Sequence, residues 1–129
     1  MKPGGISHGD RPLVAGALLM AVATVVGAFG AHYLKTKLAL DQYGILQTAV
    51  QYQFIQALGL LLVGVLASRD DNRTLRIAGD LLLAGVLLFS GSLYLLLCGA
   101  PRLIGVLTPI GGVSLIAGWC LTAVALRRA

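Results

Sequence analysis

Asp80 has the clearest potential for chemistry in this sequence, because its carboxyl group lies inside a long apolar segment, residues 75–98. A helix of that length can cross the ~30 Å hydrocarbon core of a bilayer. A carboxylate at that depth could bind a proton or a cation, since ionisable residues in membrane spans usually face a cavity. It could also be structural, because Arg76 lies at the i, i+4 spacing of a helical ion pair and can reach the interface. The spacing favours the structural role.

Further polar residues belong mostly to the opposite half of the membrane, if each helix rises ~1.5 Å per residue. An apolar layer around Leu58 and Leu87 is expected to separate them from Asp80. The candidate polar network comprises Asp80, Arg76, His32, Gln51, Gln53, Gln56, Tyr94, Ser90 and Thr108.

Each of these outer groups has two interpretations. His32 could sense or relay protons, but we favour a role in capping the first span or bonding to the second. The glutamines and tyrosines could hold a polar ligand or a quinone head group. More often such side chains join neighbouring helices through hydrogen bonds, and we favour that role here.

Residue patterns typical of catalysis are missing from the sequence. It contains no CxxC motif, glycine-rich phosphate loop, paired carboxylates or nucleophile–base pair. His32 has no cysteine or carboxylate at ligand spacing, so we expect no metal site. We expect no cofactor and no enzymatic activity. Cys98 and Cys120 should lie at different depths as free thiols, buried as small hydrophobic groups.

The composition is that of an integral membrane protein. Hydrophobic residues make up 57% of the chain and charged residues 12%, and the mean hydropathy is +0.87. A soluble domain carries about a quarter charged residues. The net charge of +5 does not indicate a nucleic-acid partner, because the basic residues lie between apolar runs rather than in a dense patch. The expected partner is the lipid bilayer.

Hydropathy predicts an all-α fold, a bundle of four transmembrane helices in a single domain, residues 13–129. The predicted spans are 13–31, 49–67, 75–98 and 104–126, preceded by a flexible tail over 1–12. The first span is longer than the apolar region of a signal peptide, so we expect it to be retained. Residues 32–48 should form a short amphipathic segment at the interface. Pro109 should kink the last span.

Small residues predict where helices approach one another closely. The glycines expected at helix contacts are Gly27, Gly30, Gly91, Gly111, Gly112 and Gly118. In the third span, a charged, small and hydroxyl-bearing stripe should face protein or water rather than lipid. That stripe contains Arg76, Asp80, Ala84, Leu87, Gly91, Tyr94 and Cys98.

Basic residues predict the orientation in the membrane. Four spans place both termini on one side, and that side carries seven of the ten Lys and Arg residues, whereas the other side carries three. The positive-inside rule therefore predicts that both termini are cytoplasmic.

Five short segments occur in an order that resembles one known family. They are GAFGAH at 27–32, QTAVQYQ at 47–53, SGSLY at 90–94, TPIGG at 108–112 and AGW at 117–119. The series is similar to the transmembrane protein 256-like family, or domain-of-unknown-function 423, of bacteria and mitochondria. The resemblance implies a four-span protein of the bacterial inner membrane, with no settled activity. A His often stands in that family where this chain has Gln56, which puts proton transfer there in doubt.

The sequence leaves three classes of function open. Small-residue stripes on three spans favour a non-catalytic interaction, accessory or assembly protein, either a homo-oligomer or a subunit of a larger membrane complex. The alternative is a conduit for a proton, ion or small solute through Asp80 and the outer polar group. A lipid- or quinone-binding protein is a third possibility.

Overall fold

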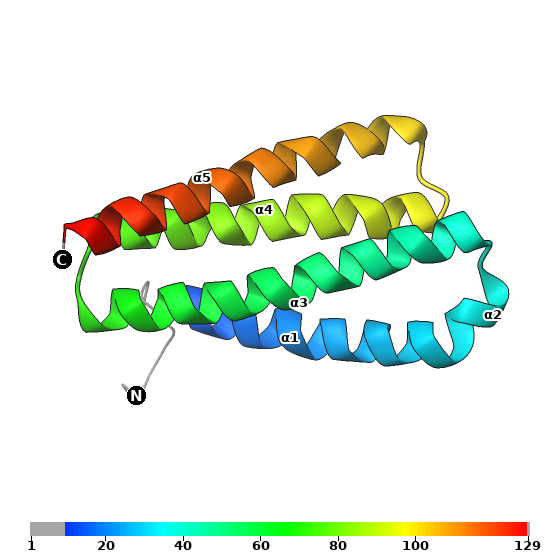
Figure 1. Ribbon diagram of the computed structural model, residues 1–129, viewed down its shortest axis with the longest axis horizontal. Coiled ribbons are helices and arrows are strands. Elements are labelled where there is room, and N and C mark those ends of the chain that lie inside the picture. Colours follow the sequence, from blue (N-terminus) through cyan, green and yellow to red (C-terminus); the bar gives the residue numbers. More distant parts are fainter. Residues whose placement is uncertain (1–9, 129) are drawn as a thin grey trace.

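Four long helices make up most of the protein in a computed structural model that describes residues 10–128 (Figure 1). The long helices are α1 (Arg11–Phe29), α3 (Leu40–Arg69), α4 (Arg73–Leu97) and α5 (Leu107–Arg127). With their short helical extensions, all four are long and apolar enough to cross a membrane. The predicted four-helix membrane fold is confirmed. Residues 1–9 of the predicted tail lie outside the described residues.

The first helix begins at Arg11, two residues earlier than expected. Pro12 lies in its first turn, where a missing N–H costs no helical hydrogen bond. Arg11 and Pro12 therefore belong to the bundle rather than to a flexible tail.

The segment between the first two spans differs from the predicted interfacial helix. Residues Gly30–Leu34 form a π-helical turn, η1, which continues into the short helix α2 (Lys35–Lys37). The chain becomes extended at Leu38, and α3 starts at Leu40, nine residues before the predicted span. The amphipathic stretch is thus divided between the end of the first span and the first turns of the second. The Gln42 side chain accepts a hydrogen bond from the Ala39 N–H at this start.

Local sequence explains both ends of α4. The Asn72 side chain accepts a hydrogen bond from the Thr74 N–H and so caps the N-terminus. At the other end Gly99 has a φ of +96°. The N–H of Gly99 bonds to the Leu96 carbonyl and that of Ala100 to the Leu95 carbonyl. This is a Schellman motif, in which glycine is favoured because it adopts a positive φ without strain.

Pro109 does not kink the last span. Residues Arg102–Val106 form a 3₁₀ helix, η2, and α5 begins at Leu107. Pro109 therefore lies in the first turn of α5, where the backbone N–H groups have no α-helical acceptor within the helix. The expectation of a kink was wrong because the α-helix starts three residues later than the predicted span.

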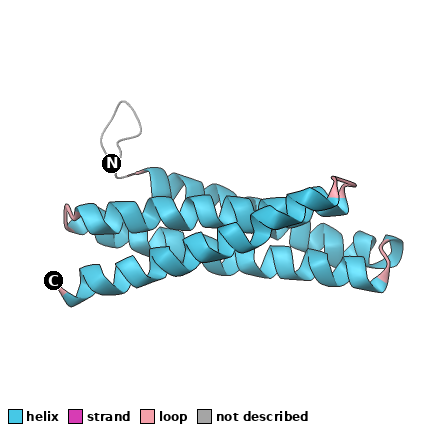
Figure 2. Ribbon diagram, turned by 90° about the horizontal axis from the view of Figure 1, so that it is seen from above, coloured by secondary structure: helices cyan, strands magenta, loops and turns pink. Residues whose placement is uncertain are grey.

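Helices that are neighbours in sequence pack side by side. Helix α1 packs on α3, α3 on α4, and α4 on α5, and Figure 1 shows them in that order across an elongated rod. Seen from above, the helices cross obliquely and are joined by short turns (Figure 2). The start of α1 and the end of α5 lie at the same end of the rod. The fully buried centre contains Leu60, Val63, Leu82 and Val86.

Glycines permit the closest helix contacts. A Cβ at Gly111 would lie 2.5 Å from the Phe89 nitrogen and 2.8 Å from the Gly85 oxygen, which are backbone atoms of α4. A Cβ at Gly118 would lie 2.9 Å from the Leu82 side chain, and one at Gly30 would lie 2.9 Å from the Leu46 side chain. Small residues therefore bring α1 against α3 and α4 against α5.

Two of the expected contact glycines are placed differently. Nothing lies within 4 Å of a Cβ built at Gly91, and one built at Gly112 meets only Phe89 at 3.9 Å. Gly91 lies on the side of α4 that does not receive a neighbouring backbone, so its predicted packing role was wrong. Gly59 was not among the glycines predicted at helix contacts, yet the Trp119 indole occupies the space that a methyl group at this position would need.

Gly111→Ala should destabilise the bundle by about 1–3 kcal/mol, because its methyl group would meet rigid backbone of α4. The measurement is the midpoint of unfolding by SDS in mixed micelles. Gly91→Ala is the matched control and should leave stability unchanged or slightly raised, since Ala is the better helix former. Equal losses in both variants would contradict this account of α4–α5 packing.

Candidate functional site

Gln53 joins three helices near the middle of the bundle. Its side chain is 2% exposed. The Gln53 Nε2 donates to the Leu19 carbonyl of α1 at 2.8 Å, and its Oε1 accepts from the Tyr94 hydroxyl of α4 at 2.6 Å. One carboxamide thus uses both its donor and its acceptor to connect α3 with its two neighbours.

Other interhelical hydrogen bonds extend this pattern to every adjacent pair of spans. The Trp119 indole N–H donates to Gln56 Oε1 at 2.8 Å, joining α5 to α3. The Ser90 hydroxyl donates to the Ala49 carbonyl at 2.8 Å. Between α4 and α5, the Ser92 and Thr108 hydroxyls share a hydrogen bond, and Ser114 donates to the Leu81 carbonyl.

These bonds satisfy the buried polar side chains. Within residues 10–128, no buried side-chain nitrogen or oxygen lacks a hydrogen-bond partner. Of the sequence-predicted network, the structure brings Gln53 and Tyr94 into contact and places Ser90 with them around one small cavity. Gln56 and Thr108 each bond elsewhere. These hydrogen bonds give the side chains a role in helix association.

His32 and Gln51 stand apart from this network. His32 is exposed on the η1 turn and makes no hydrogen bond to any described residue, so it neither caps the first span nor contacts the glutamines of α3. Gln51 is also exposed and has no hydrogen bond within the described chain. Grouping Gln51 with Gln53 by depth missed this difference, because residues two apart lie on different sides of a helix.

Asp80 and Arg76 do not form the expected ion pair. The Arg76 guanidinium contacts Asp71, with 3.7 Å between Nη1 and Oδ1. Asp80 is exposed and has no ion-pair partner within 4 Å among residues 10–128. It lines a cavity at the end of the bundle where α1 and α4 begin. The i, i+4 spacing permits a pair, but Asp71 in the preceding turn is also within reach of Arg76.

The first half of the charged stripe of α4 does not face protein within the bundle, contrary to expectation. Arg76, Asp80, Ala84 and Leu87 are exposed, whereas Gly91 and Tyr94 of the same stripe are partly buried. The face that packs against α3 and α5 is instead made of small and apolar residues: Leu75, Ala78, Gly79, Leu82, Gly85, Val86, Ser90 and Ser92. Two helices pack closely against α4, and only small residues leave room for their backbones. The small residues of α4 are therefore the buried ones, rather than the charged ones. Leu58 is exposed too, and the apolar layer between the two polar levels consists of the buried core residues.

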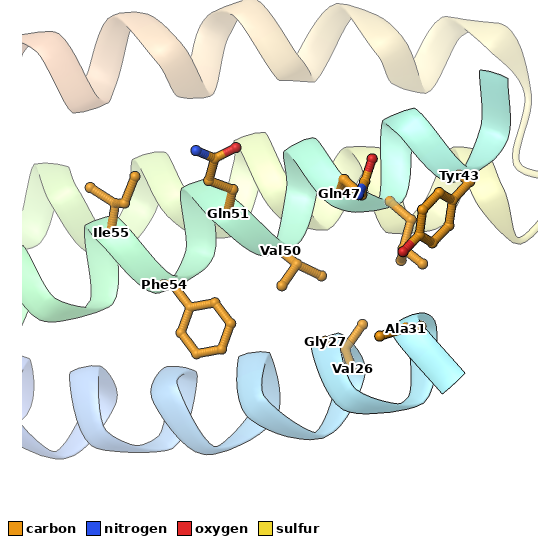
Figure 3. A pocket seen from close by; sticks show the side chains of 11 residues that line it. Val26, Gly27, Ala31, Tyr43, Gln47, Val50, Gln51, Phe54 and Ile55 are labelled. Carbon is orange, nitrogen blue, oxygen red and sulfur yellow. The ribbon is translucent and has the colours of Figure 1, made fainter. Parts of the chain in front are cut away.

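A groove of about 540 Å³ runs between the end of α1 and the start of α3 (Figure 3). Gly27 and Ala31 on the α1 side leave it open, and Val50 and Phe54 point from α3 toward α1. Gln51 lies on the rim, on the side of α3 turned away from α1. Gln47 extends the same rim one turn further out, and Tyr43 closes the outer end of the groove.

Gln51 lies well inside the membrane. It is between three and four residues from the middle of the 30-residue helix α3, or about 5 Å at 1.5 Å per residue. The hydrocarbon core extends about 15 Å from its midplane. With the middle of α3 at the midplane of the bilayer, Gln51 therefore lies roughly 10 Å inside the edge of the hydrocarbon core, where lipid tails offer its side chain no hydrogen bond.

The remaining reactive groups are the two cysteines and the possible metal ligands. Cys98 and Cys120 are both free, as expected, but both are exposed rather than buried. No group of three or more His, Cys, Asp or Glu residues in the described part of the chain could hold a metal ion.

Four long apolar helices joined by internal hydrogen bonds define a polytopic α-helical membrane protein. Residues 26–112 match the family described as "Protein of unknown function (DUF423)", and the chain belongs to this family. No solved structure matches it.

Three relatives of this chain are described as membrane proteins. UPF0382 membrane protein SH2409 of Staphylococcus haemolyticus is 42% identical over 109 residues, 84% of this chain and 88% of the relative. UPF0382 membrane protein YwdK of Bacillus subtilis is 40% identical over 114 residues, 88% of this chain and 93% of the relative. UPF0382 inner membrane protein YgdD of Escherichia coli is 36% identical over 116 residues, 90% of this chain and 88% of the relative.

Tyr94→Phe should lower the free energy of unfolding by about 0.6 kcal/mol, and at most by about 1.7 kcal/mol, because Gln53 Oε1 loses its partner. The matched control is Tyr52→Phe. The Tyr52 ring is tilted by 30° against that of Phe89, with centroids 4.3 Å apart, but its hydroxyl bonds to no described residue. That variant should keep its stability within a few tenths of a kcal/mol. A Tyr94→Phe protein as stable as the control would show that the Gln53 contact adds nothing.

Proposed function

We propose that this protein is a non-catalytic membrane component that acts by lateral association, with a second copy of itself packed along the α1–α3 groove. The observation that carries the proposal is Gln51, an amide without a partner among the described residues, at a depth where lipid cannot supply one. The buried polar groups of the described bundle, in contrast, are paired within it. A hydrogen bond from a partner helix would pair the Gln51 amide in the same way.

A carboxamide is self-complementary, because it carries both a donor and an acceptor. A second copy inserted in the same orientation places its own Gln51 at the same depth. A two-fold axis along the membrane normal then lets the two side chains exchange a pair of hydrogen bonds. Such an isologous interface uses one surface patch twice and closes as a dimer.

The shape of the groove supports close approach by another helix. Gly27 and the exposed Ala31 have little or no side chain to fill the groove, and small residues are typical of sites where transmembrane helices pack. The apolar floor of Val50 and Phe54 offers contact area, and Gln47 and Gln51 offer specific bonds at the rim. Small residues alone would not define a partner, but the unpaired amides at a common depth favour an identical chain.

The packed centre supports this role over that of a conduit. Leu60, Val63, Leu82 and Val86 have essentially no exposure and separate the level of Asp80 from that of Gln53. Hydroxyls and amides on the outer side are committed to interhelical bonds. An accessory or assembly role, without transport or catalysis, agrees with these features.

We infer that both termini lie in the cytoplasm. Among the described residues, the end that holds the start of α1 and the end of α5 carries six arginines. They are Arg11, Arg69, Arg73, Arg76, Arg127 and Arg128. The opposite end carries Lys35, Lys37 and Arg102. This bias agrees with the positive-inside rule.

Gln51→Cys, in a protein whose two native cysteines are replaced by alanine, should form a disulfide-linked dimer in native membranes under mild oxidation. The matched control is Val113→Cys on α5, which is 66% exposed and lies about as deep in the membrane. The control should remain monomeric on the same gel. Equal cross-linking of the two variants would overturn the proposed interface. A product of another mass would mean that a different subunit covers this face.

Gln51→Leu should weaken dimerisation roughly ten-fold, because it removes both hydrogen bonds of the reciprocal pair, each worth about 0.6 kcal/mol in a membrane. The monomer should be no less stable, since Leu is compatible with lipid at that depth. Förster transfer between labelled copies in liposomes of varied protein density measures the dissociation constant. Val113→Leu is the control and should leave it unchanged. Unaltered association of Gln51→Leu would contradict the role of the amide.

A further inference from the structure

A second cavity, of about 260 Å³, lies at the end of the bundle where α1 and α4 begin. It is separate from the α1–α3 groove and shares no lining residue with it. Three helices contribute to its walls. The lining residues are Arg11 and Pro12 of α1, Ala67 of α3, and Arg73, Arg76, Ile77 and Asp80 of α4.

The charge of this cavity is positive. Three guanidinium groups face a single carboxylate, so the lining has a formal charge of +2. Arg76 also contacts Asp71 at 3.7 Å, and the Asp71 side chain is 89% exposed. Each guanidinium has five N–H donors, so the cluster has far more donors than Asp80 and Asp71 can use. The surplus suits an anion with several acceptor oxygens.

The whole end of the bundle that holds this cavity also has a net positive charge. Its six described arginines are accompanied by Asp10, Asp70, Asp71 and Asp80, which leaves a formal charge of +2. The opposite end has Lys35, Lys37 and Arg102 against Asp41, but within the described residues these basic groups do not gather around one of the cavities described above. The cluster of arginines around a cavity is therefore a local feature and not a general property of the surface.

The depth of the arginines matches that of lipid head groups. Arg73 is twelve residues from the middle of α4, the 25-residue helix, or about 18 Å at 1.5 Å per residue. That is a few ångströms outside the hydrocarbon core, which ends about 15 Å from the midplane. Arg76 is one turn deeper and can extend its side chain outward. Asp80 lies deeper still, at the inner end of the cavity.

We propose that this cavity binds the phosphodiester of an anionic phospholipid, with Arg11 and Arg73 as its main ligands. Guanidinium groups bind phosphate oxygens in a bidentate manner, and basic pockets between transmembrane helices are suited to acidic lipid head groups. Ile77 is an exposed apolar residue in the cavity wall, and Val14 and Leu18 are exposed apolar residues one and two turns deeper on the side of α1 that carries Arg11. These apolar neighbours can hold acyl chains, which favours a lipid over a free anion.

In this arrangement Asp80 lowers the affinity of the cavity for the lipid phosphate. Its carboxylate lies deeper than the phosphate and repels it, and so limits how tightly the lipid is held. This assigns the intramembrane carboxylate a role in lipid binding that requires neither proton transfer nor an ion path.

Native mass spectrometry of the full chain tests the proposal, with phosphatidylglycerol and phosphatidylcholine of identical acyl chains as probes. The wild-type protein should retain phosphatidylglycerol preferentially. Arg73→Gln and Arg11→Gln should each lower that retention about five-fold, the value expected for one arginine near an anionic lipid surface. Asp80→Asn should raise it. Each of these three side chains is exposed, so folding is not at risk.

Arg127→Gln is the matched control, because it removes the same charge from the same end of the bundle but lies outside the cavity. It should retain phosphatidylglycerol as the wild type does. Equal losses in Arg127→Gln and Arg73→Gln would overturn the site, because net charge alone would then explain binding. Equal retention of the two lipids would also overturn it. Displacement of the lipid by soluble glycerol 3-phosphate would assign the cavity to a free phosphate instead.

Discussion

Hydrogen bonding without water is the constraint on which the rest of this structure depends. In the hydrocarbon core, a side-chain amide or hydroxyl that lacks a protein partner gains nothing from its surroundings. The bundle meets this constraint with bonds between helices, and Gln53 is the central example, because it connects α3 to both α1 and α4. Trp119 and Gln56 do the same between α5 and α3. These bonds fix which residues of neighbouring helices lie level with one another.

Close packing and hydrogen bonding support each other in this arrangement. The Trp119 indole fits over Gly59 only because that residue has no side chain, and this position brings its N–H to Gln56. In the same way, Gly111 allows α5 to approach the backbone of α4, and Ser114 then reaches the Leu81 carbonyl. Small residues thus determine how close two helices lie, and polar residues determine which residues of the two helices lie level with each other.

The same constraint distinguishes the two sites proposed for this protein from the rest of its surface. Most exposed residues of the spans are apolar and suit lipid. Gln51 and the arginines around Asp80 do not, and each set lies at a depth that indicates a different partner. An amide deep in the hydrocarbon requires a protein group, whereas guanidinium groups at the surface can bind lipid phosphate. Both proposed sites would give this four-span protein of the DUF423 family a role based on association.

Four membrane-spanning helices could be predicted from the sequence, because hydropathy and length are local properties that need no knowledge of neighbours. The buried face of each helix and the partner of each polar group could not be predicted in the same way, because both depend on how the helices pack together. The charged stripe with Asp80 looked like the inner face of α4, yet the helix buries Gly79, Gly85 and Ser90 instead. Gln51 and Gln53 looked alike in sequence, but only Gln53 meets Tyr94. The physical reason is that burial in a membrane bundle follows from the approach of two backbones, and that approach depends on small residues of both helices at once.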